Sequence, residues 1–260
     1  MTGIGVRLRR QVRAARHLIG DRRAMGDAES ARRFRRLRHY RTSPGGSLVE
    51  LRPRALGGAP LLVRPGTSDA QVVWYSFVQQ RHLPPSGLSA PSVILDLGAN
   101  IGATMAHFAS LYPTARVFGA ELDPGNAALC RRNVASFGER CRVIEAAVWN
   151  VDGRIAYDVE AGREDGASVD PAGRRFARAI SLRSLLDLVG GQADYVKINV
   201  EGAESALLSA EGWEGVRAVG VEVHEPFTTA ACAEQLRRIG FAIDGSRGPW
   251  VYGRRPAAET

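Results

Sequence analysis

Two apolar runs, each with an acidic residue at or near its end, flank a glycine-rich turn in the middle of the chain. The first run is Val93–Leu97, which contains Asp96 and leads directly into the turn Gly98–Gly102. A helical pattern follows the turn, and the second apolar run ends at Glu121. Strand, glycine turn, helix, strand and acid, in this order, predict one half of a nucleotide-binding α/β fold.

The residues of this turn favour S-adenosylmethionine over a dinucleotide. A dinucleotide loop has the spacing G-x-G-x-x-G, because its middle glycine lets the backbone approach a pyrophosphate, whereas Asn100 occupies that position here. S-adenosylmethionine has no pyrophosphate, and a carboxylate suits its ammonium or its ribose hydroxyls. We expect a cofactor site that contains Asp96, Gly98, Asn100, Gly102 and Glu121.

Three more residues are expected to line the cofactor. Leu122 follows Glu121, Ala147 lies in the next apolar run, and Asn199 lies near the end of the run 194–200. Ligands of open α/β sheets bind beyond the carboxyl ends of the strands, so these scattered residues would meet in one crevice.

The runs 194–200 and 216–223 end in residues suited to catalysis. Methyl transfer from a sulfonium needs an aligned nucleophile, and an alcohol nucleophile also needs a base. Histidine is the best base near neutral pH, and the expected catalytic residues are His224, Glu201, Asn199 and Lys197. Glu204 either assists them or is simply the first-turn acid of a helix. We expect no metal, although a divalent ion would use Glu201, Glu222 and His224.

Positive charge is concentrated at the start of the chain. The 260 residues carry a formal net charge of +8 and contain 34 arginines but only one lysine, Lys197. Thirteen of the arginines and three acids fall in residues 1–41, so the remainder is close to neutral. We interpret residues 4–19 as a basic amphipathic helix, which would pack on the protein, join two copies as a homodimer, or contact an anionic surface or nucleic acid. Residues 29–40 are expected to form a second, short basic helix.

The composition excludes several classes of protein. No apolar run reaches roughly 18 residues, the length that predicts a membrane span, and the first residues lack the apolar stretch of a secretory signal. Cys130, Cys141 and Cys232 show no zinc-ligand spacing and are odd in number, as expected for reduced thiols of a cytoplasmic protein.

Strands and helices are expected to alternate after residue 90. Strands are predicted over 93–97, 117–120, 142–148, 194–200 and 216–223, helices up to about 112 and over 124–137, 182–189 and 228–239, and a terminal antiparallel hairpin at 241–243 and 250–252. The stretch 152–178 predicts a surface loop or small hairpin over the site. Together these elements predict an α/β fold with a Rossmann-like, doubly wound and mostly parallel sheet.

The chain is expected to have three parts. Residues 1–46 would form an arginine-rich helical extension. Residues 47–90 would form a β-hairpin, at 48–53 and 61–63, and a helix at 70–80. Residues 91–260 would form the cofactor-binding domain.

Five segments resemble the FkbM family of S-adenosylmethionine-dependent methyltransferases. They are R-P-G-T-S-D at 64–69, V-I-L-D-L-G-A-N-I-G at 93–102, G-A-E-L-D-P at 119–124, D-Y-V-K-I-N-V-E-G-A-E at 194–204 and V-E-V-H at 221–224. The resemblance covers residues 47–245 and implies the class I methyltransferase fold. It implies the cofactor residues named above and places the segment 197–204 beside the transferred methyl.

One departure from the family affects the expected mechanism. The family usually has Asp at the position of Asn199, and an amide cannot act as a base. A base at this position would therefore be replaced by His224 or Glu201.

The resemblance implies O-methylation of a small-molecule biosynthetic intermediate, such as a sugar or a secondary metabolite of the antibiotic type. The departure at Asn199 leaves two alternatives, N-methylation of a small-molecule amine and a catalytically silent cofactor-binding protein. The arginine-rich start of the chain leaves RNA or DNA methylation as a third, although the chain has no N-P-P-Y-type segment for a flipped base. We expect a small-molecule acceptor rather than a nucleic acid.

Overall fold

The computed structural model describes residues 20–39, 46–85, 88, 90–159, 167–169 and 172–256. The helix expected over 4–19, and with it the dimer contact suggested for that helix, lies outside these residues. The chain divides into two compact units between Gln80 and Arg81.

The first unit contains the basic helix and the β-hairpin that the sequence predicts. α2 spans Ala28–His39, and β1 (Val49–Leu51) pairs antiparallel with β2 (Leu61–Val63) across a short 3-10 turn, Arg54–Leu56. α3 (Asp69–Trp74) continues into one π-helical turn, Tyr75–Gln79, which confirms a helix in this region. The core of the unit includes the buried side chains of Phe34, Leu51, Leu61 and Val73.

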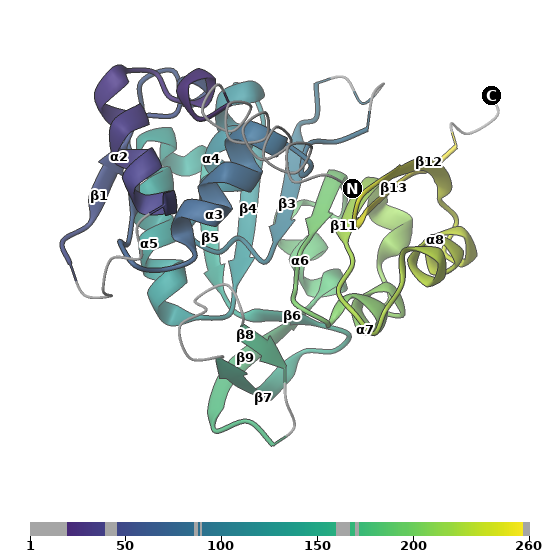
Figure 1. Cartoon of the computed structure of the whole chain (residues 1–260). Helices are drawn as coiled ribbons and strands as arrows, with labels where there is room; N and C mark the ends of the chain where they lie inside the picture. Colours follow the sequence, from purple (N-terminus) through teal and green to yellow (C-terminus); the bar gives the residue numbers. More distant parts are fainter. Residues whose placement is uncertain are drawn as a thin grey trace, which may run out of the picture. The chain divides into compact units, whose positions relative to one another are not determined.

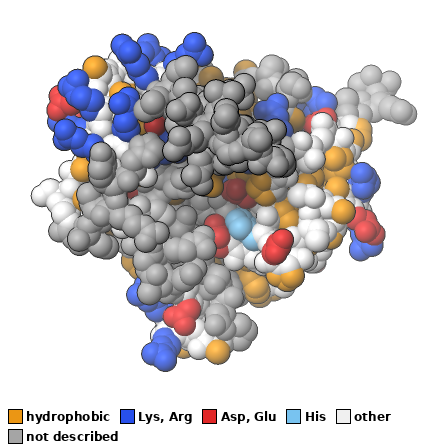
Figure 2. Space-filling view, viewed as in Figure 1, with side chains coloured by type: hydrophobic (Ala, Val, Ile, Leu, Met, Phe, Trp, Pro, Cys, Tyr) orange, Lys and Arg blue, Asp and Glu red, His pale blue; other side chains and the backbone are white. Residues whose placement is uncertain are grey.

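One face of α2 is buried and the other is basic. Ala31 and Phe34 are buried, whereas Arg32 and Arg36 are exposed one helical turn apart. Basic side chains gather over this helix in the space-filling view (Figure 2). The amphipathic pattern in the sequence therefore corresponds to a helix that packs on its own unit and presents arginines to solvent.

A seven-stranded sheet forms the centre of the second unit, in the order β12-β13-β11-β10-β3-β4-β5 (Figure 1). Its parallel strands are β3 (Val93–Leu97), β4 (Arg116–Glu121), β5 (Cys141–Glu145), β10 (Ala193–Ile198) and β11 (Val216–Glu222). β13 (Trp250–Arg254) runs antiparallel to both β11 and β12 (Ala242–Arg247). The Rossmann-like, mostly parallel α/β fold with a terminal antiparallel hairpin is thus confirmed.

Helices connect the parallel strands. They are α4 (Ala103–Leu111), α5 (Pro124–Val134) with the 3-10 segment η3 (Ala135–Arg140), α6 (Leu182–Val189), α7 (Glu204–Leu208) with η4 (Trp213–Gly215), and α8 (Thr229–Arg238). Three of them begin with a side chain that accepts a hydrogen bond from a backbone N–H of the first turn, which stabilises the helix start. The capping residues are Asp123 for α5, Ser181 for α6 and Thr228 for α8.

All five residues of β3 are buried, as is typical of a parallel strand that is covered on both faces. The main core extends from Leu95 and Leu97 to Val196 and Val219 on the neighbouring strands. The strand order reverses between β3 and β10, and ligands of such sheets bind beyond the carboxyl ends at this switch point.

The segment after β5 differs from the expectation. The single strand predicted over 142–148 is two strands, because β5 ends at Glu145 and β6 (Ala147–Trp149) joins a second sheet, β6-β9-β7-β8. The stretch expected as a loop or small hairpin forms the remaining strands of that sheet: β7 (Gly153–Val159), β8 (Ala167–Val169) and β9 (Arg175–Ser181).

The sequence conceals this second sheet because Gly, Arg, Asp and Ser interrupt its apolar residues, so no strand after β6 has a continuous apolar run of typical strand length. Alternation is nevertheless present in the antiparallel β7–β9 ladder. Tyr157 is buried on one face, while Phe176 on the other face is exposed and carries the Arg154 guanidinium 4.6 Å from its ring centroid. No helix among the described residues is long and apolar enough to cross a membrane.

Candidate active site

The glycine turn after β3 packs against the end of β10. Gly98 has a φ of +78°, and a Cβ atom there would lie 1.7 Å from the carbonyl oxygen of Asn199. Gly102 has a φ of +82°, and its Cβ would lie 2.8 Å from Cys130 Sγ on α5. Both positions therefore require glycine, which explains the G-x-x-x-G spacing by packing and backbone conformation.

Glu121 fixes the shape of this loop from the end of β4. Its Oε2 accepts a hydrogen bond from the Asn100 backbone N–H at 2.8 Å, and its Oε1 accepts one from the Asp123 N–H at 2.9 Å. Burial raises the pKa of Glu121, although these two hydrogen bonds oppose the shift. Asn100 itself has a positive φ of 49°, a conformation that asparagine tolerates better than most residues.

Asp96 lies under the loop and is completely buried. The Lys197 ammonium lies 2.8 Å from Asp96 Oδ1 and donates a hydrogen bond to the Gly98 carbonyl at 2.7 Å. The Thr104 hydroxyl, from the first turn of α4, donates to the other carboxylate oxygen. The single lysine of the chain thus neutralises Asp96 and ties β10 to the glycine loop.

Asn199 follows β10 on the opposite side of the loop. Its backbone N–H donates to the Leu97 carbonyl at 3.0 Å. Its side-chain oxygen Oδ1 is buried and has no hydrogen-bond partner in the described part of the chain. A buried acceptor of this kind is costly unless a donor reaches it.

His224, directly beyond β11, lies between two carboxylates. Its Nδ1 is 2.7 Å from Glu204 Oε1 at the start of α7, and its Nε2 is 3.5 Å from Glu201 Oε1. Glu204 is fully buried, whereas the side chains of His224 and Glu201 are 27% and 25% exposed. Figure 2 shows a histidine side chain with acidic side chains around it on the visible face.

The acidic surroundings determine the charge of His224. Burial alone would lower the pKa of His224, but the hydrogen bond with Glu204 and the negative charge of Glu201 outweigh burial, so the pKa is raised. Burial raises the pKa of Glu222, at the end of β11, although the charges of His224 and Lys197 oppose this shift. Among the described residues, no three His, Cys, Asp or Glu side chains are grouped to hold a metal ion.

The structure brings most of the expected site residues to one edge of the sheet. Asp96, Gly98, Asn100, Gly102 and Glu121 lie in or around the β3–α4 loop. Lys197, Asn199 and Glu201 come from β10 and the turn after it, Glu222 ends β11, and His224 follows β11. Leu122 follows Glu121 and is partly exposed. Ala147 lies in β6 of the second sheet, where it is buried opposite Ala179, and not in the third strand of the main sheet as expected.

Sequence reasoning missed two contacts of the site. Thr104 was not expected to bind Asp96, although it lies eight residues further on, in the first turn of α4. Arg175 of β9 lies 3.7 Å from Asp123 Oδ2, directly after the Glu121 strand. The second contact had no signal in the sequence, because it depends on a sheet that was not predicted.

A buried histidine pair joins His107 of α4 to His82, which precedes the main sheet in the chain. His82 Nε2 is 3.1 Å from His107 Nδ1, and the Tyr195 hydroxyl donates to the His82 carbonyl at 2.9 Å. Burial lowers the pKa of His82 well below its ordinary value, and the charges of His107 and Lys197 lower it further. His82 is therefore neutral at physiological pH.

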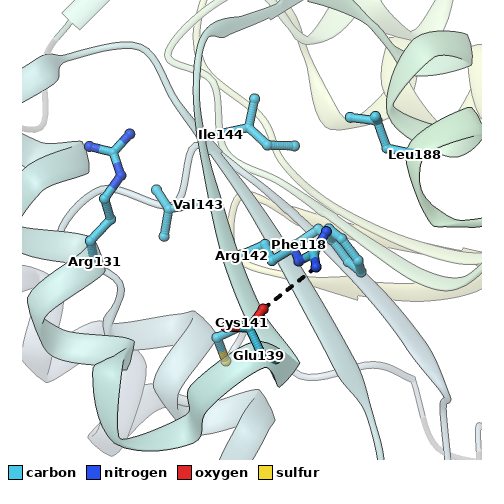
Figure 3. A pocket seen from close by; sticks show the side chains of 8 residues that line it. All are labelled: Phe118, Arg131, Glu139, Cys141, Arg142, Val143, Ile144 and Leu188. Atoms are coloured by element: carbon cyan, nitrogen blue, oxygen red, sulfur yellow. Dashed lines mark ion pairs between the residues drawn. The ribbon is translucent and has the colours of Figure 1, made fainter.

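A separate hollow of about 420 Å³ lies along the edge strand β5 (Figure 3). It is lined by Phe118, Arg131, Glu139, Cys141, Arg142, Val143, Ile144 and Leu188, none of which is an expected site residue. Arg142 and Glu139 pair at 3.5 Å within it. Burial raises the pKa of the Cys141 thiol to about 11, so this cysteine is a poor nucleophile near neutral pH.

Two solved structures are similar to this chain, at low sequence identity. An O-methyltransferase family protein from Burkholderia thailandensis is 16% identical with a TM-score of 0.48, and the match covers 74% of this chain and 59% of that one. The S-adenosylmethionine-dependent methyltransferase SibL is 16% identical with a TM-score of 0.45, over 88% of this chain and 68% of that one.

Comparison of this sequence with known proteins and with family models shows the family of the chain. The 2-O-methyltransferase NoeI of Sinorhizobium fredii (strain NBRC 101917 / NGR234) is 38% identical over 137 residues, which are 45% of this chain and 56% of that protein. The chain thus matches little more than half the length of this curated relative. The sequence model of the methyltransferase FkbM domain matches residues 96–242, from the buried acid of β3 to the start of β12. The chain belongs to the FkbM methyltransferase family.

Proposed function

We propose that this protein is an S-adenosylmethionine-dependent methyltransferase that methylates a hydroxyl group of a small-molecule biosynthetic intermediate, such as a sugar or a secondary metabolite. The observation that carries the proposal is the meeting of the glycine loop and its acid, Glu121, with the Glu204–His224 pair at one edge of the sheet. The FkbM family and the 2-O-methyltransferase activity named for the relative support it.

The residues around the loop fit this cofactor. Each oxygen of Glu121 accepts one backbone N–H, and the Asn126 side chain also hydrogen-bonds the carboxylate. A carboxylate has about four acceptor positions, so Glu121 can also accept a ribose hydroxyl. The unpartnered Oδ1 of Asn199 can accept a hydrogen bond from an ammonium. When bound, S-adenosylmethionine supplies a methyl group on a positively charged sulfur. Asp96 and Lys197 would support the loop from beneath.

His224 is the base of the proposed reaction. If Glu204 is ionised it can only accept a hydrogen bond, so the neutral imidazole carries its proton on Nδ1 and leaves Nε2 able to accept one. With the cofactor bound, the acceptor O–H bond would break as its proton moves to Nε2, and the oxygen lone pair would form the bond to the methyl carbon. The bond from that carbon to sulfur would break at the same time, with its electron pair left on the sulfur of S-adenosylhomocysteine. Glu201, on the same side of the ring, would hold the acceptor hydroxyl in line.

An amine acceptor is the second candidate. Three carboxylates, Glu201, Glu204 and Glu222, contribute negative charge at His224, and such surroundings favour a cation over an anion. An amine that loses its proton to solvent also needs less help from a base. The same charges disfavour a nucleic acid, whose phosphates would be repelled.

Cofactor binding is tested first, because it does not need the acceptor. We expect calorimetry to detect S-adenosylmethionine binding to the full chain, with affinity falling at least tenfold in Glu121→Gln. Glu145→Gln is the matched control, because Glu145 is the residue opposite Glu121 in the β4–β5 ladder but is exposed and paired with Arg131. Equal affinity in both variants would contradict the proposed cofactor site.

Activity is tested with methyl-labelled S-adenosylmethionine and an extract of the source organism, separated into small-molecule, nucleic-acid and protein fractions. We expect label in the small-molecule fraction, lost in Glu121→Gln, and stable to treatments that remove methyl esters. Mass analysis of the product distinguishes an O-methyl from an N-methyl group. Label in nucleic acid alone would reject the proposal in favour of RNA or DNA methylation, and cofactor binding without label in any fraction would favour a catalytically silent protein.

A further inference from the structure

Glu204 is buried in a way that a helix start does not explain. Its carboxylate is completely inaccessible to solvent, and α7, the helix that it begins, has only five residues. A buried ionised carboxylate needs a charged or hydrogen-bonding partner. The reason for burying Glu204 must therefore lie in its contacts rather than in the helix dipole.

Few contacts satisfy this carboxylate within the described residues. Its Oε1 accepts a hydrogen bond from the Gly202 N–H at 3.2 Å and lies 2.7 Å from His224 Nδ1. Its Oε2 is buried and has no hydrogen-bond partner there. Among the described residues, the side chain that hydrogen-bonds Glu204 is thus the imidazole of His224, twenty residues further along the chain.

We propose that Glu204 is a positioning residue, which holds the His224 imidazole by Nδ1 so that Nε2 points to the mouth of the site. The expected effect of Glu204 on catalysis rests on the methyl transfer proposed above. The contact of Glu204 with the His224 ring does not depend on that proposal. This one contact fixes both the position of the His224 ring and its tautomer, because an acceptor at Nδ1 keeps the ring proton there.

The three carboxylates around His224 shift its pKa in the same direction. Glu201 from the turn after β10, Glu204 from α7 and Glu222 from β11 all raise the pKa of His224 against the effect of burial. Cys232 of α8 lies near Glu204, but its thiol has a pKa raised to about 12 by burial and stays neutral. Of these groups, Glu204 alone is in hydrogen-bond contact with the ring.

Replacing Glu204 with glutamine removes the negative charge but keeps the shape of the side chain. Glu204→Gln keeps an oxygen that can accept from Nδ1 and from the Gly202 N–H, but removes the negative charge. We expect the pKa of His224, measured from its C2–H resonance, to fall by about one unit, which corresponds to about 1.4 kcal/mol. His224→Gln identifies the resonance, and Glu214→Gln, which removes an exposed acid paired with Arg183, should leave it unchanged.

The wild-type protein gives a second measurement that does not depend on a variant. Nitrogen-15 shifts of the neutral imidazole should show the proton on Nδ1, together with a pKa above that of an unperturbed histidine. A neutral form protonated on Nε2, or a His224 pKa that does not change in Glu204→Gln, would overturn the proposal.

Kinetics then tests the consequence for catalysis. We expect Glu204→Gln to lower kcat by tenfold or more, to shift the ascending limb of the pH profile to lower pH, and to leave calorimetric affinity for S-adenosylmethionine unchanged. A shifted His224 pKa with an unchanged kcat and pH profile would support the hold of Glu204 on the ring and reject His224 as the base. Failure of the proposed function is thereby distinguishable from failure of this inference.

Discussion

Gly98 and Asn199 approach so closely that no side chain fits between them. A Cβ atom on Gly98 would lie 1.7 Å from the Asn199 carbonyl oxygen, and the φ of +78° is itself unfavourable for other residues. The backbones of the cofactor loop and of the segment after β10 are therefore in direct contact. Any substitution at Gly98 must separate them.

Gly98→Ala should consequently destabilise the protein by about 3 kcal/mol or more, since overlap adds to a backbone strain of about 1 kcal/mol. Denaturant unfolding measures the loss. Gly190→Ala is the matched control, because Gly190 has a φ of +99° but nothing within 4 Å of its Cβ position. It should lose about 1 kcal/mol. Similar losses in both variants would show that the overlap is relieved at little cost.

The Asp96–Lys197 pair should be important for stability because both partners are buried. Lys197→Met leaves the Asp96 carboxylate without its counter-charge, and we expect a loss of about 3–5 kcal/mol in unfolding free energy. The double variant Asp96→Asn/Lys197→Met should recover part of it. Arg131→Met, which breaks an exposed pair with Glu145, should cost less than about 1 kcal/mol. Additive effects in the double variant would argue against direct coupling.

The burial of His82 should make the protein less stable in mild acid. Because burial lowers the pKa of His82 in the folded state, the unfolded chain binds the proton more readily below about pH 6.5. The contribution of neutral His82 to the free energy of unfolding is therefore fully present above that pH and is lost as the pH falls. His224 acts in the opposite sense, since its raised pKa favours the folded protein at low pH.

Urea unfolding at pH 7.5 and pH 5.5 measures this dependence. We expect His82→Gln to reduce the loss of stability between the two pH values, and His224→Gln to increase it. The same pH dependence in wild type and His82→Gln would mean that His82 does not titrate in this range on unfolding.

Asn199 offers a test of charge at the proposed cofactor site. Asn199→Asp should tighten S-adenosylmethionine relative to S-adenosylhomocysteine, which lacks the sulfonium charge, by roughly fivefold or about 1 kcal/mol. Calorimetry with both ligands measures the ratio. Gln192→Glu makes the same charge change at an exposed position before β10, at the opposite end of that strand, and should leave the ratio unchanged. A shifted ratio in the control, or none in Asn199→Asp, would place Asn199 away from the sulfur.

The local patterns of the sequence were enough to predict the main sheet and the loop residues. The runs 93–97 and 194–198 are mostly apolar, each with a charged residue within it, and the glycine turn that follows the first run has a definite backbone requirement at Gly98. The carboxyl-end rule for α/β sheets then placed Glu121 and His224 at one edge. These predictions needed no knowledge of contacts distant in the sequence.

Other features depend on such contacts and left no local signal. The run 141–149 has no turn residue, yet the strand breaks at Ala146, whose backbone N–H donates to the Glu121 carbonyl at 3.0 Å. Glu204 reads as an ordinary first-turn acid until β11 brings His224 to within 2.7 Å of it. Lys197 stood out by composition, but its partner Asp96 lies on another strand.

The antiparallel ladder between β7 and β9 determines where the second sheet can change in length. Its rungs run from Gly153↔Ala179 to Tyr157↔Arg175, and β8 continues the sheet beyond them. An antiparallel pair can be closed by a two-residue turn at any rung. Shortening or lengthening the far end of this arm would thus leave the rungs near Ala179 in register, so the arm can change in length while the edge of the main sheet that carries the proposed site keeps its geometry.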